Sequence, residues 1–412
     1  MDWRVALRIG ALVVVIGIPV TIYWAPYTAA FIVGIVEALA PLWLPVLLLA
    51  IAWPLWLTYV RSQYVSAIQY ATLELKPGDN TPKSAQPMEL VFYSLYHRTE
   101  VTLISSMLMG MVRVPWSFEI AASNGVVRFF MHIPVHHRAA VEGRLRAEYR
   151  DIDIDEVRDY SREDHFDPIN DRLTMREYTL SKADPYPLRT YTSHEHEKEK
   201  HDIFSEMLEG LATVGEGEHV WMQFMIRPHQ RDWGRGYFDF LNTQTDTLHD
   251  DARTVIQKLV GSSGDVRGLP ANKQATIKAI EEALQKPSFD CGLRVVYMAE
   301  RSRWSDERAE SLDTLFERFD DPDLNGFESY DPRANVGWPL TDVFAALPAL
   351  DMEYFLKLYR RRAFFAPPYY GRAFVLNAEE MATVYHIPKL GRASALSRAR
   401  GKRLEPPDNL PV

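Results

Sequence analysis

The residues with the clearest potential for chemistry are three histidines in the stretch HEHEKEKH, which are His194, His196 and His201. Two histidines spaced two apart on a strand point to the same side, and imidazole nitrogens are common metal ligands. Such a pair would suit metal-dependent nicking of single-stranded DNA. The run is otherwise charged and has no apolar residue that would hold a metal site rigid. An exposed charged loop is the simpler interpretation, and we expect no metal ion.

Motifs for the commonest forms of catalysis are absent from the sequence. No G-x-x-x-x-G-K-[ST] segment is present to cradle phosphates, and neither G-x-S-x-G nor H-E-x-x-H occurs. The run GSSGDVRG at 261–268 is glycine-rich without a lysine in place, which is typical of a loop. His136 and His137 follow Pro134 at the start of a predicted helix, where helix-start or surface roles are expected. We therefore expect neither catalytic residues nor a cofactor.

The composition of the 412-residue chain indicates a folded protein with more than one domain. Apolar residues make up 47% and charged residues 25%, which provides enough apolar material for packed cores. The formal net charge of −9 argues against a globally basic nucleic-acid-binding protein. The single cysteine, Cys291, rules out an internal disulfide and lies in an apolar run, where we expect it to be buried.

The first element of the chain is an apolar N-terminal segment. Between Arg8 and Arg61 the only charged residue is Glu37. A membrane-spanning helix needs about 20 apolar residues, so the segments 5–23 and 31–60 each suffice for one span. We therefore predict a transmembrane helical hairpin. A single span with a re-entrant or interfacial partner is the alternative.

The distribution of basic residues predicts the orientation of this hairpin. Arg4 and Arg8 precede it and Arg61 follows it, whereas the predicted turn at 24–28 carries no charge. Because basic residues stay on the cytoplasmic side, both termini and the soluble part should be cytoplasmic, with the protein in the inner membrane. Glu37 then either contacts another helix within the bilayer or is wetted near the headgroups.

Beyond the membrane segment the hydrophobic periodicity predicts alternating strands and helices. The stretch 71–160 has the order strand, helix, two strands joined by Asn124-Gly125, helix and strand, and Asn-Gly is a strong hairpin signal. This β-α-β-β-α-β order is that of a ferredoxin-like unit with helices on one face of an antiparallel sheet. The same order recurs between 172 and 330, with an insertion at 229–288. The predicted fold class is therefore α+β.

The C-terminal segment is rich in loops apart from one capped helix at 377–387. Asn377 and, three residues later, Glu380 form a capping box, in which each side chain satisfies one free backbone amide. Pro388 stops the helix, and the tail 389–403 that follows has six Lys or Arg and no acidic residue. The tail would contact anionic lipid, nucleic acid or an acidic protein, or act as a solvated tether.

The chain therefore divides into four predicted parts. They are a transmembrane hairpin (1–62), a first ferredoxin-like unit (63–160), a second such unit (172–330) and a loop-rich C-terminal segment (331–412).

Several stretches resemble the non-motor N-terminal region of the coupling ATPases of conjugation and type IV secretion, as found in candidate-phylum bacteria with small genomes. They are LELKPGDNTPKSAQPMELVFYSLY, SFEIAASNGVVRFFMHIPVHHRAAVEGRLRAEYRDIDIDEV, YPLRTYTSHE, FVLNAEEMATVYHIP and LEPPDNLP. The resemblance covers most of 71–410. In that family the equivalent of the capped helix and the proline-rich strip lead into a hexameric ATPase core. This chain ends where that motor would begin, so the resemblance implies an anchor, paired α+β units and a motor-docking segment, but no ATP hydrolysis.

The leading hypothesis is a membrane-anchored, non-catalytic scaffold or adaptor of a conjugative or type IV secretion-like translocation machine, recruiting a separate motor ATPase. We expect it to be oligomeric and to contact the lipid bilayer. The residues predicted to contact the motor are Asn377, Glu379, Glu380, Met381, Val384, His386, Arg398, Arg400, Lys402 and Arg403. The alternatives are the nickase built on His194 and His196, and a membrane-bound nucleic-acid-binding protein in which the strand-face residues Arg128, Phe130 and His132 contact bases.

Overall fold

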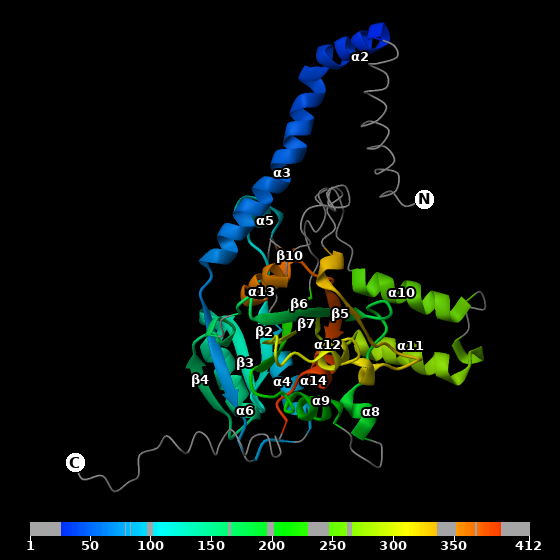
Figure 1. Cartoon of the computed structure of the whole chain (residues 1–412). Helices are drawn as coiled ribbons and strands as arrows, with labels where there is room; N and C mark the ends of the chain where they lie inside the picture. Colours follow the sequence, from blue (N-terminus) through cyan, green and yellow to red (C-terminus); the bar gives the residue numbers. More distant parts are fainter. Residues whose placement is uncertain are drawn as a thin grey trace. The chain divides into compact units, whose positions relative to one another are not determined.

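The computed structural model of the chain divides into two compact units (Figure 1). One comprises Met1–Val60 with Val336–Ala349, and the other comprises Arg61–Asn335 with Leu350–Val412. The structure describes residues 26–388 except 79, 83, 97–101, 164–165, 196–201, 230–246, 262–265, 336–351 and 367–368. Its mixed helix and strand content confirms the predicted α+β class.

The N-terminal unit is helical over its described residues. Helix α2 covers Pro26–Ala38, and helix α3 covers Ala40–Ala67 and so continues into the second unit. The two are interrupted next to Pro41, which has no amide hydrogen to continue the helical ladder. The indole N–H of Trp43 bridges the interruption by donating to the Val36 carbonyl at 2.9 Å. Among the described residues, α3 is the one helix long and apolar enough to cross a membrane.

The predicted turn of the hairpin is wrong in its second half. Helix α2 begins at Pro26, inside the stretch 24–28. Proline favours the first helical position because its ring presets φ and its missing amide hydrogen is not needed there. The predicted first span, 5–23, lies outside the described residues together with Arg4 and Arg8, so the hairpin stays a prediction.

A nine-stranded sheet forms the centre of the second unit (Figure 1). The strands are β1 (Tyr70–Lys76), β2 (Trp116–Ser123), β3 (Val126–Pro134), β4 (Asp153–Val157), β5 (Asp171–Leu180), β6 (Glu218–Pro228), β7 (Ser288–Glu300), β8 (Phe327–Tyr330) and β11 (Phe374–Asn377). Their order is β4-β1-β3-β2-β6-β7-β5-β8, all neighbours are antiparallel, and β11 pairs with the first part of β7. Strand β2 pairs with β6 from Trp116↔Ile226 to Ser123↔His219. The segments predicted as two units therefore share one sheet.

Helices connect the strands of this unit. They are α4 (Gln86–Leu95), α5 (Leu103–Leu108), α6 (Arg138–Glu148), α7 (Tyr160–Glu163), α8 (Tyr191–Glu195), α9 (Ile203–Leu211), α10 (Thr247–Val260), α11 (Ala271–Ala283), α12 (Asp306–Ser311), α13 (Met352–Arg360) and α14 (Ala378–Val384). The Asn124-Gly125 turn between β2 and β3 has φ angles of 53° and 73°, which confirms the hairpin predicted there.

One face of the sheet carries the hydrophobic core. Phe118 of β2 contacts Phe92 of α4, with ring centres 5.2 Å apart, and Tyr385 just after α14, at 5.1 Å. Phe204 of α9 also reaches Tyr385, at 5.9 Å. Alternate residues of the strands point to this face, so the apolar alternation of the sequence places the core beneath α4, α9 and α14.

The opposite face is also buried, but its centre is polar. Glu119 of β2, Gln223 of β6 and Arg294 of β7 are neighbours in register and are each at most 1% exposed. The Gln223 side-chain amide donates to Glu119 at 2.8 Å, and the Arg294 guanidinium donates to Gln223 at 2.8 Å. A row of hydrogen-bonded polar side chains therefore crosses three strands.

Residues 352–366 cover this polar row, and Arg362 makes the decisive contact. Its guanidinium donates to both carboxylate oxygens of Glu119, each at 2.9 Å, and to Asp159 at 2.9 Å. Burial alone would raise the pKa of Glu119, but the Arg362 charge lowers it to about 2. Arg362 has a φ of 52°, which is unfavourable for a residue with a side chain. Its ion pairs hold it in that conformation.

The structure corrects two predictions here, for the C-terminal segment and for one face of β3. The C-terminal segment is not only loops, because α13 and β11 lie within 352–377. Phe130 is 1% exposed and stacks on Tyr160 of α7, with ring centres 4.5 Å apart. His132 stacks on Tyr70 at 4.7 Å. These rings are occupied by other parts of the chain, so the prediction that this strand face stacks on bases is wrong.

We predict that Arg362→Met destabilises the protein by about 3–5 kcal/mol, because it leaves the buried carboxylate of Glu119 and the half-buried carboxylate of Asp159 without their cation. Chemical denaturation of the purified chain measures the change. Arg333→Met is the matched control: its partner Asp331 is surface-accessible, so a loss of at most about 1 kcal/mol is expected. Equal losses for the two variants would contradict a structural role for the buried pair.

Candidate functional site

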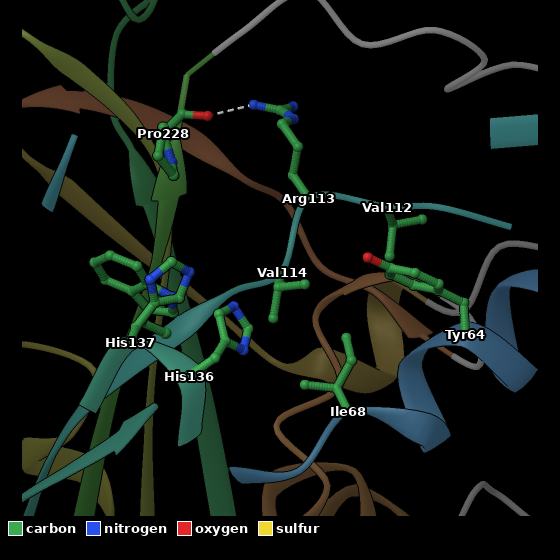
Figure 2. Close-up of a pocket in the computed structure, with 9 residues that line it drawn as sticks. Tyr64, Ile68, Val112, Arg113, Val114, His136, His137 and Pro228 are labelled. Carbon is green, nitrogen blue, oxygen red and sulfur yellow. Dashed lines mark hydrogen bonds between the residues drawn. The ribbon is translucent and has the colours of Figure 1, made fainter. Parts of the chain in front are cut away.

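A pocket of about 120 Å³ lies beside the C-terminal end of α3 (Figure 2). Its lining residues come from four parts of the chain: the end of α3, the loop before β2, the turn after β3 and the end of β6. They are Tyr64, Ile68, Val112, Arg113, Val114, Trp116, His136, His137 and Pro228. Distant segments of the sequence thus supply aromatic, basic and apolar groups to one pocket.

Two adjacent histidines form the polar wall of this pocket. His136 and His137 end a short 3₁₀ helix, Val135–His137, that leads into α6. Their ring centres are 4.1 Å apart, and the His137 ring lies 5.2 Å from the indole of Trp116. The sequence predicted only helix-start or surface roles for both residues. In the structure they contribute imidazole nitrogens to a common cavity.

Arg113 on the opposite wall belongs to a buried charge cluster. It donates to Asp290 at 3.0 Å and to the Pro228 carbonyl (Figure 2). Arg227 also donates to Asp290, at 2.9 Å, and His229 lies 2.6 Å from the second carboxylate oxygen. Burial alone would raise the pKa of Asp290, but Arg227, His229 and Arg113 together hold it well below its usual range. Asp290 therefore fixes Arg113 as a cation at the pocket wall.

This arrangement suits binding better than acid–base chemistry. None of the described lining residues is a carboxylate, whereas imidazole, guanidinium, indole and phenol groups are all present. Nitrogen and hydroxyl donors recognise an anionic group, and the apolar side chains accommodate an attached hydrocarbon. The pocket is thus chemically matched to an amphipathic anion.

The helix predicted to dock a motor lies inside the fold. The residues concerned are Asn377, Glu379, Glu380, Met381, Val384 and His386, each at most 5% exposed. The capping box is confirmed: Asn377 accepts from the Glu380 amide at 3.1 Å, and Glu380 accepts from the Asn377 amide at 2.7 Å. The helix itself ends at Val384 rather than at 387.

The polar side chains of α14 bind other parts of the same chain. Glu380 accepts a hydrogen bond from the Leu188 amide at 2.7 Å, and Glu379 forms an ion pair with Lys286. His386 lies 3.1 Å from an Asp202 carboxylate oxygen. We therefore correct the prediction that these side chains face a partner. Strand β11 precedes α14 directly and pairs with β7, which draws the helix onto the core.

Most of the remaining predicted residues lie outside the described part of the chain. Arg4, Arg8, His196 and His201 lie outside the described residues, as do the tail residues Arg398, Arg400, Lys402 and Arg403. Glu37 is exposed on α2, and Arg61 is half-buried on α3. Cys291 is buried, as predicted.

The nickase alternative loses its geometric basis at His194. This residue lies in helix α8, so it is not on the strand that would point His194 and His196 to one side. Within the described part of the chain, no group of three or more His, Cys, Asp or Glu residues is placed to hold a metal ion.

Sequence reasoning missed Arg113, Glu119, Arg294 and Arg362. A signal was present for two of them, because Glu119 and Arg294 interrupt otherwise apolar strands (WSFEIAAS and FDCGLRVVYMAE). A charged residue in the middle of a buried strand requires a partner. The sequence does not identify that partner, because Arg362 is 243 positions away from Glu119.

We predict that Glu380 makes stability depend on pH. Burial raises the pKa of Glu380 from 4.5 to about 7, although the amides of Asn377 and Leu188 and the charge of Lys286 oppose the rise. Its contribution to stability is complete below about pH 4.5 and is lost as the pH rises through about 7. Glu380→Gln cannot ionise, so the wild-type protein should lose up to about 3 kcal/mol relative to this variant between pH 4.5 and 8. Thermal unfolding across that range tests this, and parallel pH profiles would contradict it.

The comparison with known proteins gives a family without an assigned function. The family model described as Domain of unknown function (DUF8128) matches residues 67–393, which is well over half of the chain. The match starts at the last residue of α3 and includes the whole sheet. No curated protein matches the sequence. The chain therefore belongs to the DUF8128 family.

Proposed function

We propose that this protein is a membrane-anchored, non-catalytic scaffold of a conjugative or type IV secretion-like translocation machine, with its α+β body at the cytoplasmic surface of the inner membrane. The observation that carries the proposal is the exposed apolar surface of α3. Leu42, Val46 and Leu49 are 71%, 67% and 64% exposed, and the most apolar stretch of the helix has none of its residues buried.

A lipid environment would cover a surface of this kind, which supports the proposed anchor. A soluble protein rarely exposes a contiguous apolar area of more than a few hundred Å². Helix α3 has 28 residues, which corresponds to about 42 Å at 1.5 Å per residue and exceeds the bilayer core of about 30 Å. Arg61, near its C-terminal end, matches the cytoplasmic side of the positive-inside rule.

We further propose that each half of the sheet is a ferredoxin-like unit. The strand order β4-β1-β3-β2 in the first half and β8-β5-β7-β6 in the second supports this, because both correspond to order 4-1-3-2 within their own half. Antiparallel pairing between all neighbours also agrees. Pairing of β2 with β6 joins the two units edge to edge, so the body contains one continuous sheet.

The pairing of charged side chains within the body is consistent with a structural role. The buried Glu119, Arg294 and Arg362 are engaged with each other, with the half-buried Asp159 or with main-chain groups of the covering segment. Because α14 is buried, we place contact with the motor ATPase on the basic tail, at Arg398, Arg400, Lys402 and Arg403. A cluster of cations favours an acidic protein surface.

We predict that the anchor has both ends in the cytoplasm. The chain has one cysteine, so Cys291→Ala provides a background without thiols. In that background Thr28→Cys should react with a membrane-impermeant maleimide in intact spheroplasts, because it follows the predicted first span. Asp2→Cys and Ala395→Cys should react only after permeabilisation. Labelling of Ala395→Cys from outside, or release of the chain by alkaline carbonate, would contradict the proposal.

We predict that the tail recruits the motor. Changing Arg398, Arg400, Lys402 and Arg403 to Ala should weaken co-purification of a coexpressed coupling-type ATPase at least tenfold, because the cations that attract it are lost. The matched control changes the exposed Arg253, Lys258, Lys273 and Lys278 to Ala, which removes the same charge. Unchanged co-purification in the tail variant, or an equal loss in the control, would rule out this contact.

A further inference from the structure

We propose that the pocket in Figure 2 binds the phosphate of an anionic phospholipid from the membrane that α3 crosses. The body would then be held at the lipid surface at a second point besides its anchor. This inference rests on the proposed membrane anchor.

Chain connectivity keeps the pocket close to the membrane boundary. Tyr64 is part of α3 and follows Trp56, a residue type favoured at the interface, by about 12 Å along the helix axis. Ile68 comes directly after α3 ends at Ala67. These separations along the chain are set by the helix itself.

Exposed apolar side chains flank the pocket in the sequence. Ile104, Leu108 and Met109, on and just after α5, are 68%, 62% and 67% exposed. Ile104 and Leu108 are four residues apart and so share one face of the helix. The loop that follows α5 supplies pocket residues, and Val135, next to His136, is 46% exposed. An apolar surface beside a polar pocket is what insertion at the acyl-chain boundary requires.

The pocket has the size and chemistry for a phosphate group. Its volume of about 120 Å³ exceeds the roughly 10–15 Å³ that a single water needs, so the pocket has room for a polyatomic group such as phosphate. His136 and His137 bring ring nitrogens, Arg113 adds a cation at the wall that is paired with Asp290, and none of the described lining residues is acidic. Trp116 and Tyr64 are amphipathic rings of the type that membrane interfaces favour.

Titration of the full-length chain in detergent with water-soluble dihexanoyl lipids tests the proposal. We expect dihexanoyl phosphatidylglycerol to bind at least tenfold more tightly than dihexanoyl phosphatidylcholine, measured by calorimetry. The His136→Ala/His137→Ala variant should lose at least tenfold in affinity for phosphatidylglycerol. His249→Ala, an exposed histidine on α10, should leave it unchanged.

Two milder variants distinguish loss of lipid binding from loss of folding. His136 is exposed, so the single variant His136→Ala should fold and still show a several-fold loss if folding of the double variant fails. Tyr64→Phe, which removes only one hydroxyl, should reduce the preference for phosphatidylglycerol without changing thermal stability.

Three outcomes would overturn the proposal. They are equal affinity for the two lipids, unchanged affinity in the histidine variants, and competition by inorganic phosphate as strong as that by phosphatidylglycerol, which would identify a free-anion site. Failure of the anchor is distinguishable: a chain released by carbonate that still prefers phosphatidylglycerol would contradict the proposed function alone. A chain that resists carbonate without any lipid preference would contradict this inference alone.

Discussion

The ion pair between Arg362 and Glu119 is the interaction on which the second face of the sheet depends. Glu119 is fully buried, and a carboxylate in that position is tolerated only with a cation and hydrogen bonds. Arg362 supplies both and also binds Asp159, so one side chain connects the sheet, the segment after α13 and the segment before α7. The unfavourable φ of Arg362 is the local cost of this closure.

Strand pairing and the polar row together join the two halves of the body. Strand β2 would be an unpaired edge if the first half stood alone, and so would β6 in the second half. Pairing of these strands removes both edges, while the hydrogen-bonded row from Glu119 through Gln223 to Arg294 crosses the junction. The outer strand β4 is short and carries Asp153, Asp155 and Glu156, which discourages further pairing.

The proposed functions follow from where the chain exposes apolar side chains and gathers basic and aromatic ones. Helix α14 and the polar row are buried, and their charged groups pair within the chain. The apolar side chains of α3 and α5 remain exposed, and the pocket beside the end of α3 combines histidine, arginine and aromatic groups. Exposed apolar surface next to basic and aromatic groups is the combination that a lipid surface complements.

The sequence by itself determined the features that depend on neighbouring residues. The Asn124-Gly125 hairpin, the Asn377–Glu380 capping box and the alternation that places β-strand residues on one face arise from short-range geometry. Only the tertiary structure decided that α14 is buried and that His136 and Arg113 line one pocket. Burial and ion pairing are set by residues far apart in the chain, because the free energy of a polar group depends on which distant segment excludes its water.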